Sequence, residues 1–171
     1  MKIAVLSDTH IGQRLSAFPK NFLKEISAFD AVIHCGDYAT LDVAKSFQEL
    51  KNFYGVFGNM DNADIHNALP EHLSVDFEGV RIGVIHGSGS PAGLTKKVYV
   101  ALCSHYPKNM FDVIFFGHAH SPSDEVISGV RFINPGAFSG NNNSSFGSWG
   151  ILTIENNSAS WELKKISTRG F

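Results

Sequence analysis

Short runs of consecutive apolar residues alternate along the chain with segments in which apolar residues recur every three or four positions. Continuous runs predict strands that are buried on both faces, and the amphipathic segments predict helices. The first third gives strands at 3–6, 31–35 and 53–57, separated by helices at 19–28, opened by Pro19, and at 40–50, capped by Thr40. This β-α-β-α-β order predicts right-handed crossovers and a largely parallel sheet.

The second part of the chain mixes hairpins with one further helix. We predict a hairpin of strands 73–77 and 80–86 around Glu78-Gly79, and a closing hairpin of 149–155 and 159–166 around Asn156-Asn157. Between them lie a helix at 93–106, a strand at 111–116, and strands at 125–127 and 130–134. Residues 139–148 are rich in Ser, Asn and Gly, and we interpret them as a mobile loop rather than a lid over a site. No repeat or linker is evident, so residues 1–171 are expected to form one domain.

Composition narrows the class of protein. Hydrophobic residues make up 43% of the chain and charged residues 18%, which excludes disordered, coiled-coil and collagen-like proteins. No apolar run approaches the roughly 20 residues of a membrane span, and the sequence turns polar at Ser7, so we expect a cytoplasmic protein without membrane partners. A net charge of -2 argues against strong nucleic-acid binding. Cys35 and Cys103 lack metal-site spacing, and we expect both to be small buried side chains without a disulfide.

Polar side chains that can bind metals follow five of the predicted strands, mostly beside glycine. In open α/β sheets, sites are built at the carboxyl ends of strands, and glycine allows the sharp turns that such sites need. Each motif alone is ordinary turn chemistry, and a lone histidine is more often a satisfied core residue. Their joint occurrence in one order predicts a shared site formed by Asp8, His10, Asp37, Asn59, Asp61, His86, His118 and His120.

The donor set suits two divalent ions. In extended backbone residues i and i+2 project to the same side, so Asp8 with His10, and His118 with His120, are expected to point into one cavity. With Asp37, Asn59 and His86 they supply seven N or O donors and no thiolate. Seven donors exceed what one tetrahedral zinc ion takes, but they fit two ions that share a carboxylate. Manganese, iron, zinc, nickel and cobalt all accept such ligands.

The ordered motifs resemble those of the calcineurin-like metallophosphoesterases. The segments that carry the resemblance are Asp8-X-His10, Gly36-Asp37, Gly58-Asn59-X-Asp61, His86-Gly87, Gly117-His118-X-His120 and Asn134-Pro135-Gly136, which together span about residues 1–140. The short chain and the Asn-Pro-Gly segment are similar to the small YfcE/MJ0936-like phosphodiesterase branch, which includes the retromer subunit vacuolar protein sorting 29. The resemblance implies an α/β fold, a four-layer α/β/β/α sandwich of two mixed sheets.

The resemblance also assigns roles to the site residues. Asp8, His10, Asp37 and His120 would hold one ion, and Asp37, Asn59, His86 and His118 the other, so that Asp37 bridges the two. With two divalent ions, two carboxylates and a bridging hydroxide, the centre carries about +1 and attracts an anionic phosphate ester. The hydroxide would attack phosphorus in line. The implied cofactors are two divalent metal ions, with Mn²⁺ ahead of Ni²⁺, Zn²⁺, Fe²⁺ or Co²⁺, and the residues expected to take part in catalysis are Asp37, Asn59, His10 and Asp61.

Two positions depart from the family pattern. Met60 stands where many members carry a histidine that acts on the leaving group, so we expect a preference for good leaving groups and weak activity on alkyl monoesters. Asp61 is expected to orient a ligand histidine rather than to act as an acid. Ser88 stands where this branch often has a second histidine, and we interpret it as a loop residue more readily than as a phosphate donor.

Two alternatives stay open at this point. Gly87–Ala92 matches the dinucleotide fingerprint G-x-G-x-x-G/A, although it follows a hairpin strand and no acidic residue ends the next strand. A metal-binding scaffold without catalysis, like the retromer subunit, is the stronger rival, because Met60 weakens the case for chemistry. The preferred hypothesis is a metal-dependent phosphodiesterase that acts on a small phosphate ester, with a homodimer or homo-oligomer allowed by the hairpin edges.

Overall fold

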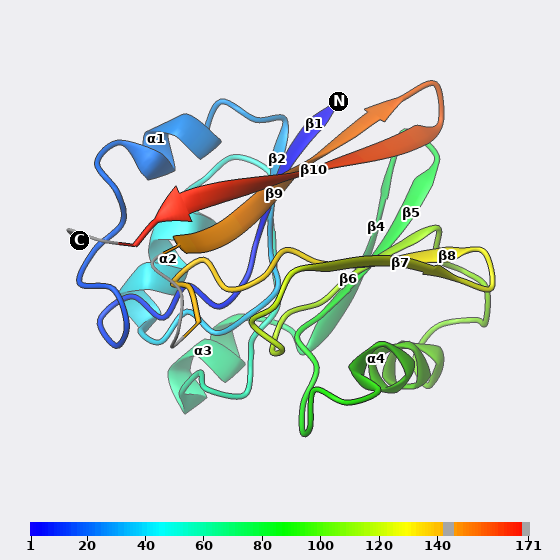
Figure 1. The fold of residues 1–171 in the computed structure, drawn as a ribbon, viewed down its shortest axis with the longest axis horizontal. Coiled ribbons are helices and arrows are strands. Elements are labelled where there is room, and N and C mark those ends of the chain that lie inside the picture. Colours follow the sequence, from blue (N-terminus) through cyan, green and yellow to red (C-terminus); the bar gives the residue numbers. More distant parts are fainter. Residues whose placement is uncertain (142–145, 169–171) are drawn as a thin grey trace.

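The structure is a computed structural model that describes residues 1–141 and 146–168, and it contains two five-stranded mixed sheets (Figure 1). The first sheet has the order β10 (Ser158–Ser167), β9 (Phe146–Glu155), β1 (Lys2–Leu6), β2 (Ala31–His34) and β3 (Phe53–Gly55). The second has the order β4 (His72–Phe77), β5 (Val80–Ile85), β6 (Val113–Phe115), β8 (Val130–Asn134) and β7 (Ser123–Ile127). Within the described residues, four helices flank them, α1 (Phe22–Ile26), α2 (Leu41–Gln48), α3 (Ala63–Ala68) and α4 (Leu94–Cys103).

The strands of both sheets run mostly as the sequence predicts. β1, β2 and β3 are parallel neighbours, and β9 and β10 add an antiparallel hairpin beside β1. In the second sheet β5, β6 and β8 are parallel, and β4 and β7 are the antiparallel edges. The predicted two-residue turns at 78–79 and 156–157, and the turn at 128–129 between β7 and β8, all have positive φ at both positions, as type I′ hairpin loops require.

Three apolar clusters separate the four layers. Ile3 and Val5 of β1 pack with Val113 and Phe115 of β6 in the cluster between the two sheets. The other face of β1, with Ala4 and Leu6, packs in the cluster that includes side chains of α1, α2 and α3. The third cluster joins the outer face of the second sheet to α4. Central strands are therefore covered on both faces, which explains why their sequences are continuous apolar runs. The predicted α/β/β/α sandwich is confirmed.

Several element bounds differ from the sequence prediction, and the three main differences concern α1, α3 and β9. α1 begins at Phe22 rather than at Pro19, because Asn21 adopts a left-handed backbone (φ 67°) that interrupts the helix. α3 was not predicted, although Asn62 caps it by accepting a hydrogen bond from the Ile65 N–H at 3.1 Å. β9 begins at Phe146, inside the predicted loop 139–148, and residues 142–145 of that loop lie outside the described residues.

Smaller expectations are partly met. Thr40 caps α2, with its hydroxyl accepting from the Val43 N–H at 3.4 Å. Cys35 is fully buried as expected, whereas Cys103 is only half-buried. Across the described residues, none of the helices combines the length and the apolar character needed to cross a membrane.

Candidate metal centre

The predicted ligand side chains meet where the carboxyl ends of strands from both sheets come together. Asp8 follows β1 and Asp37 follows β2 in the first sheet, and His86 follows β5 and His118 follows β6 in the second. Backbone hydrogen bonds tie the loops of each sheet to one another, from the Asp8 N–H to the Gly36 carbonyl at 3.0 Å and from the Gly117 N–H to the His86 carbonyl at 3.1 Å. The centre therefore needs both sheets in place.

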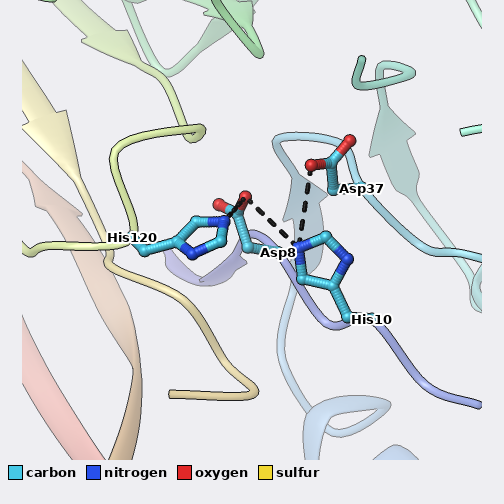
Figure 2. A group of neighbouring side chains, drawn as sticks. All are labelled: Asp8, His10, Asp37 and His120. Atoms are coloured by element: carbon cyan, nitrogen blue, oxygen red, sulfur yellow. Dashed lines mark ion pairs between the residues drawn. The ribbon is translucent and has the colours of Figure 1, made fainter. Parts of the chain in front are cut away.

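Four of these side chains form one tight group, and Figure 2 shows Asp8, His10, Asp37 and His120 pointing toward one another. One ligand atom from each lies within 4.8 Å of all the others, so the group could hold a metal ion. His10 Nε2 lies 3.8 Å from Asp8 Oδ1 and 3.7 Å from Asp37 Oδ2, and His120 Nε2 lies 3.0 Å from Asp8 Oδ1. Three of the four residues are buried, and His120 is partly exposed.

Several atoms in the group are buried without a hydrogen-bond partner among the described residues. They include Asp8 Oδ1, His10 Nε2 and His86 Nε2, which all face the same space. Burying two carboxylates beside imidazole rings with incomplete hydrogen bonding is costly, and a divalent cation accepts both kinds of group as ligands. The residues present therefore fit a divalent metal ion.

His86 has its ring fixed for this role. Its Nδ1 lies 2.6 Å from the Cys35 carbonyl, which can only accept, so Nδ1 carries the proton. Nε2 then faces the carboxylates, 3.2 Å from Asp37 Oδ2 and 3.9 Å from Asp8 Oδ1. A carbonyl behind a histidine is the usual partner that orients a metal ligand.

The charges in the group perturb one another strongly. Burial lowers the pKa of His86, but Asp8 and Asp37 outweigh this effect and raise it to about 9. Burial raises the pKa of Asp8, but His86 and His120 outweigh it and lower the pKa to about 2. The two carboxylates thus attract positive charge into a buried space, and a metal ion would displace the proton from His86.

Asn59 and His118 lie beside the first group as a separate pair. His118 Nδ1 is 2.7 Å from Asn59 Oδ1, and its Nε2 is 2.6 Å from the Gly89 carbonyl, to which it donates. The contact brings together an imidazole nitrogen and an amide oxygen, and a divalent ion accepts both kinds of group as ligands. The rings of His86 and His118 are 5.5 Å apart between centroids, so a second ion could be shared with His86.

Arg14 borders the centre, although no pattern in the sequence pointed to it. Its guanidinium lies 3.2 Å from His120 Nδ1 and 3.5 Å from the Gly140 carbonyl. Because arginine only donates, His120 Nδ1 is an acceptor in this contact and a neutral ring carries its proton on Nε2. For Nε2 to bind a metal, His120 has to give up this contact.

Asp61 acts on the backbone. Its Oδ1 accepts from the N–H groups of Tyr38 at 2.7 Å and Ala39 at 3.1 Å, and its Oδ2 accepts from those of Asp37 at 3.0 Å and Gly58 at 2.8 Å. The expected contact between Asp61 and a ligand histidine is not found among the described residues. Four N–H donors fill the carboxylate, so Asp61 positions Asp37 through its backbone.

Extended backbone, predicted for the Asp-X-His and His-X-His segments, is not what the structure shows. The backbone at these positions is left-handed, with φ of 53° at Asp8, 44° at His10, 68° at His118 and 58° at His120. Asp8 and His10 therefore converge through a tight loop and not through extended backbone, and His118 and His120 point to different partners. His120 joins Asp8 and His10, whereas His118 turns toward Asn59.

The positions that depart from the family pattern are exposed. Met60 is 54% exposed and donates its backbone N–H to Asp37 Oδ1 at 2.8 Å. In the loop that matched a dinucleotide fingerprint, the carbonyls of Gly89 and Ser90 accept from His118 and from Lys97 Nζ. That loop thus serves to hold two side chains, and its carbonyls have the wrong polarity for a phosphate.

Comparisons with known proteins place the chain in a family. Residues 1–157 match the Calcineurin-like phosphoesterase superfamily domain. The chain is 31% identical to phosphodiesterase MJ0936 of Methanocaldococcus jannaschii over 153 residues, covering 80% of this chain and 83% of that protein.

Solved structures agree with this placement. The solution structure of Thermotoga maritima protein TM1076 is 36% identical, with a TM-score of 0.75 over 96% of this chain and 99% of that one. Vps29 from Chaetomium thermophilum has a TM-score of 0.72 at 18% identity, over 96% of both chains, and this likeness concerns the fold alone. The match over residues 1–157 and the relatives together show that the chain belongs to the calcineurin-like phosphoesterase superfamily.

Proposed function

We propose that the protein is a phosphodiesterase that uses two divalent metal ions, with Mn²⁺ as the first candidate. The observation that carries this proposal is the convergence of buried carboxylate and imidazole atoms, Asp8 Oδ1, His10 Nε2 and His86 Nε2, around Asp37. The relative named as a phosphodiesterase supports the choice of a diester as the substrate.

The ligands divide between two ions in this proposal. Asp8, His10, Asp37 and His120 would hold one ion, and Asp37, Asn59, His86 and His118 the other. When bound, the ions would supply a hydroxide near neutral pH and neutralise the charge of the phosphate. The Cys35 and Gly89 carbonyls would fix the tautomers of His86 and His118, and Asp61 would keep the backbone of Asp37 in place.

The side chain at position 60 sets the expected leaving-group preference. The methionine thioether cannot donate a proton, so no general acid at that position assists departure, and such assistance is worth about 10²–10⁴-fold. We therefore expect esters of acidic phenols to react well and alkyl monoesters poorly.

Hydrolysis of bis(4-nitrophenyl) phosphate with and without Mn²⁺ tests the proposal. Asp37→Asn removes the shared carboxylate and should lower kcat/KM at least about 10³-fold. Asp42→Asn, at an exposed position in the first turn of α2, is the matched control and should retain full activity. Equal activity of the Asp37 variant and the wild type would contradict the proposal.

The alternative function is a metal-binding scaffold without catalysis. The exposed methionine at position 60, where many family members carry a catalytic histidine, is the observation that favours it. Two ions measured per chain together with no turnover of diester or monoester would support the scaffold.

A further inference from the structure

A recess of about 380 Å³ adjoins the candidate metal centre and shares Asn59 and His86 with it. It lies between α3 and α4, which are on the same side of the molecule in Figure 1, and is bounded by the segments that follow β3 and β5. Its volume is in the range of small-molecule sites. A substrate whose phosphate sits between the metal ligands can therefore extend one ester group into this space.

The walls of the recess are apolar at the base and polar at the rim. Ile85 and Val98 are nearly fully buried beneath it, and Ala101 of α4 is half-buried. Phe57 stacks on His66 with ring centroids 3.9 Å apart and an interplanar angle of 14°. These surfaces favour a flat, largely apolar ring.

The rim carries groups of both charges. Lys97 and Glu71 are exposed and line the recess from opposite elements, α4 and the segment before β4. Lys97 Nζ uses one donor on the Ser90 carbonyl at 2.9 Å and keeps two for a ligand. A ring with both hydrogen-bond acceptors and donors on its edge can use this pair, whereas an alkyl group cannot.

We propose that this recess binds a nucleoside, so that the substrates are phosphodiesters of nucleotides. The proposal rests on the proposed phosphodiesterase function, which it makes more specific. The nucleobase lies over Val98 and Ala101 near the Phe57–His66 pair, and its polar edge faces Lys97 and Glu71.

Two substrates with the same leaving group test this proposal, thymidine 5′-(4-nitrophenyl phosphate) and methyl 4-nitrophenyl phosphate. Wild-type protein with Mn²⁺ should have a KM about tenfold lower for the thymidine ester. Ala101→Phe fills the recess and should remove this advantage while it leaves the methyl ester unchanged. Val100→Phe, on the exposed side of the same helix at 59% exposure, is the matched control and should behave as wild type.

The outcomes separate this inference from the proposed function. Metal-dependent cleavage of both esters with equal KM, or an Ala101→Phe variant that keeps the preference, would overturn the nucleoside site and leave the phosphodiesterase intact. If neither ester is cleaved, the phosphodiesterase proposal fails. NMR titration with thymidine monophosphate then tests whether the recess binds a nucleoside. Shifts at Ile85, Val98 and Ala101 but not at Val100 support it, and no shifts at these residues overturn it.

Discussion

Backbone conformation at single residues determines where the candidate ligands point. Five of them have left-handed backbone, a conformation that costs non-glycine residues of order 1 kcal/mol each. The loops hold them there through hydrogen bonds such as that from the His10 N–H to the Asp37 carbonyl at 3.2 Å. The strained residues are Asp8, His10, Asp37, His118 and His120.

Buried His34 supports these loops without facing the metal ligands' common space. Its Nδ1 accepts from the Gly36 N–H at 3.1 Å, and its Nε2 lies 3.3 Å from the Thr9 hydroxyl. The ring also stacks on Tyr38 with a centroid distance of 3.9 Å. Burial, the largest influence, lowers the pKa of His34 to about 3, so the ring is neutral in the folded protein.

This burial predicts a pH-dependent stability. The unfolded chain protonates His34 below about pH 6.5, whereas the folded chain does so only near pH 3, so stability falls as the pH drops between these values. His34→Phe lowers stability at pH 7.5 because the Gly36 N–H loses its acceptor, but it removes this slope. In urea unfolding of the metal-free protein, the deficit of the variant should shrink by about 2 kcal/mol at pH 5. A deficit that is constant with pH would contradict this assignment.

At the scale of elements, Asp61 joins the ends of β2 and β3. Its carboxylate accepts three N–H groups from the loop after β2 and one from Gly58 after β3. Both loops are thereby held in one arrangement beside the metal ligands.

Replacement of this carboxylate should be costly. In Asp61→Asn the amide NH₂ would face two N–H donors, so we expect a loss of about 3 kcal/mol in the free energy of unfolding. Chemical denaturation measures it, with Asp64→Asn at an exposed position in the first turn of α3 as the control. A loss no larger than that of the control would show that the four hydrogen bonds contribute little.

The elements that the sequence predicts well are those with buried apolar runs. β1, β2 and β6 pack on both faces, so their apolar character is almost continuous along each strand. α3 has only six residues and one fully buried side chain, Ile65, so its apolar pattern was too short to detect. The Asn62 cap was the available signal.

At the scale of the whole molecule, the candidate centre links the two sheets, since it takes side chains from the ends of β1 and β2 and of β5 and β6. The ligands are far apart in sequence and come together only in the folded chain. A metal ion therefore binds the folded state and not the unfolded state, and so it stabilises the fold. Mn²⁺ at 100 times its Kd should stabilise the protein by about 2.7 kcal/mol per site.

Thermal unfolding checks this expectation. The Tm should rise with Mn²⁺, return to its starting value with a chelator, and rise less in Asp37→Asn than in Asp42→Asn. The same rise in both variants would place the stabilising ion elsewhere in the molecule.

The candidate ligands could be predicted from the sequence, but the residues around them could not. Asp8, His10, Asp37 and His120 do gather at one site, because each follows a strand whose carboxyl end lies at the same edge of its sheet. The position of Arg14 depends on its contact with His120, which is distant in sequence. The recess beside Asn59 is likewise lined by segments that are distant in sequence. Neither feature can be predicted from a local sequence pattern.

The position of β1 in the middle of its sheet has a consequence for synthesis on the ribosome. β1 pairs with β2 on one side and with β9 on the other, and β9 is made about 150 residues later. During most of translation the nascent chain therefore carries an apolar central strand with one edge uncovered. The native pairing of that edge of β1 forms only after the β9–β10 hairpin has left the exit tunnel.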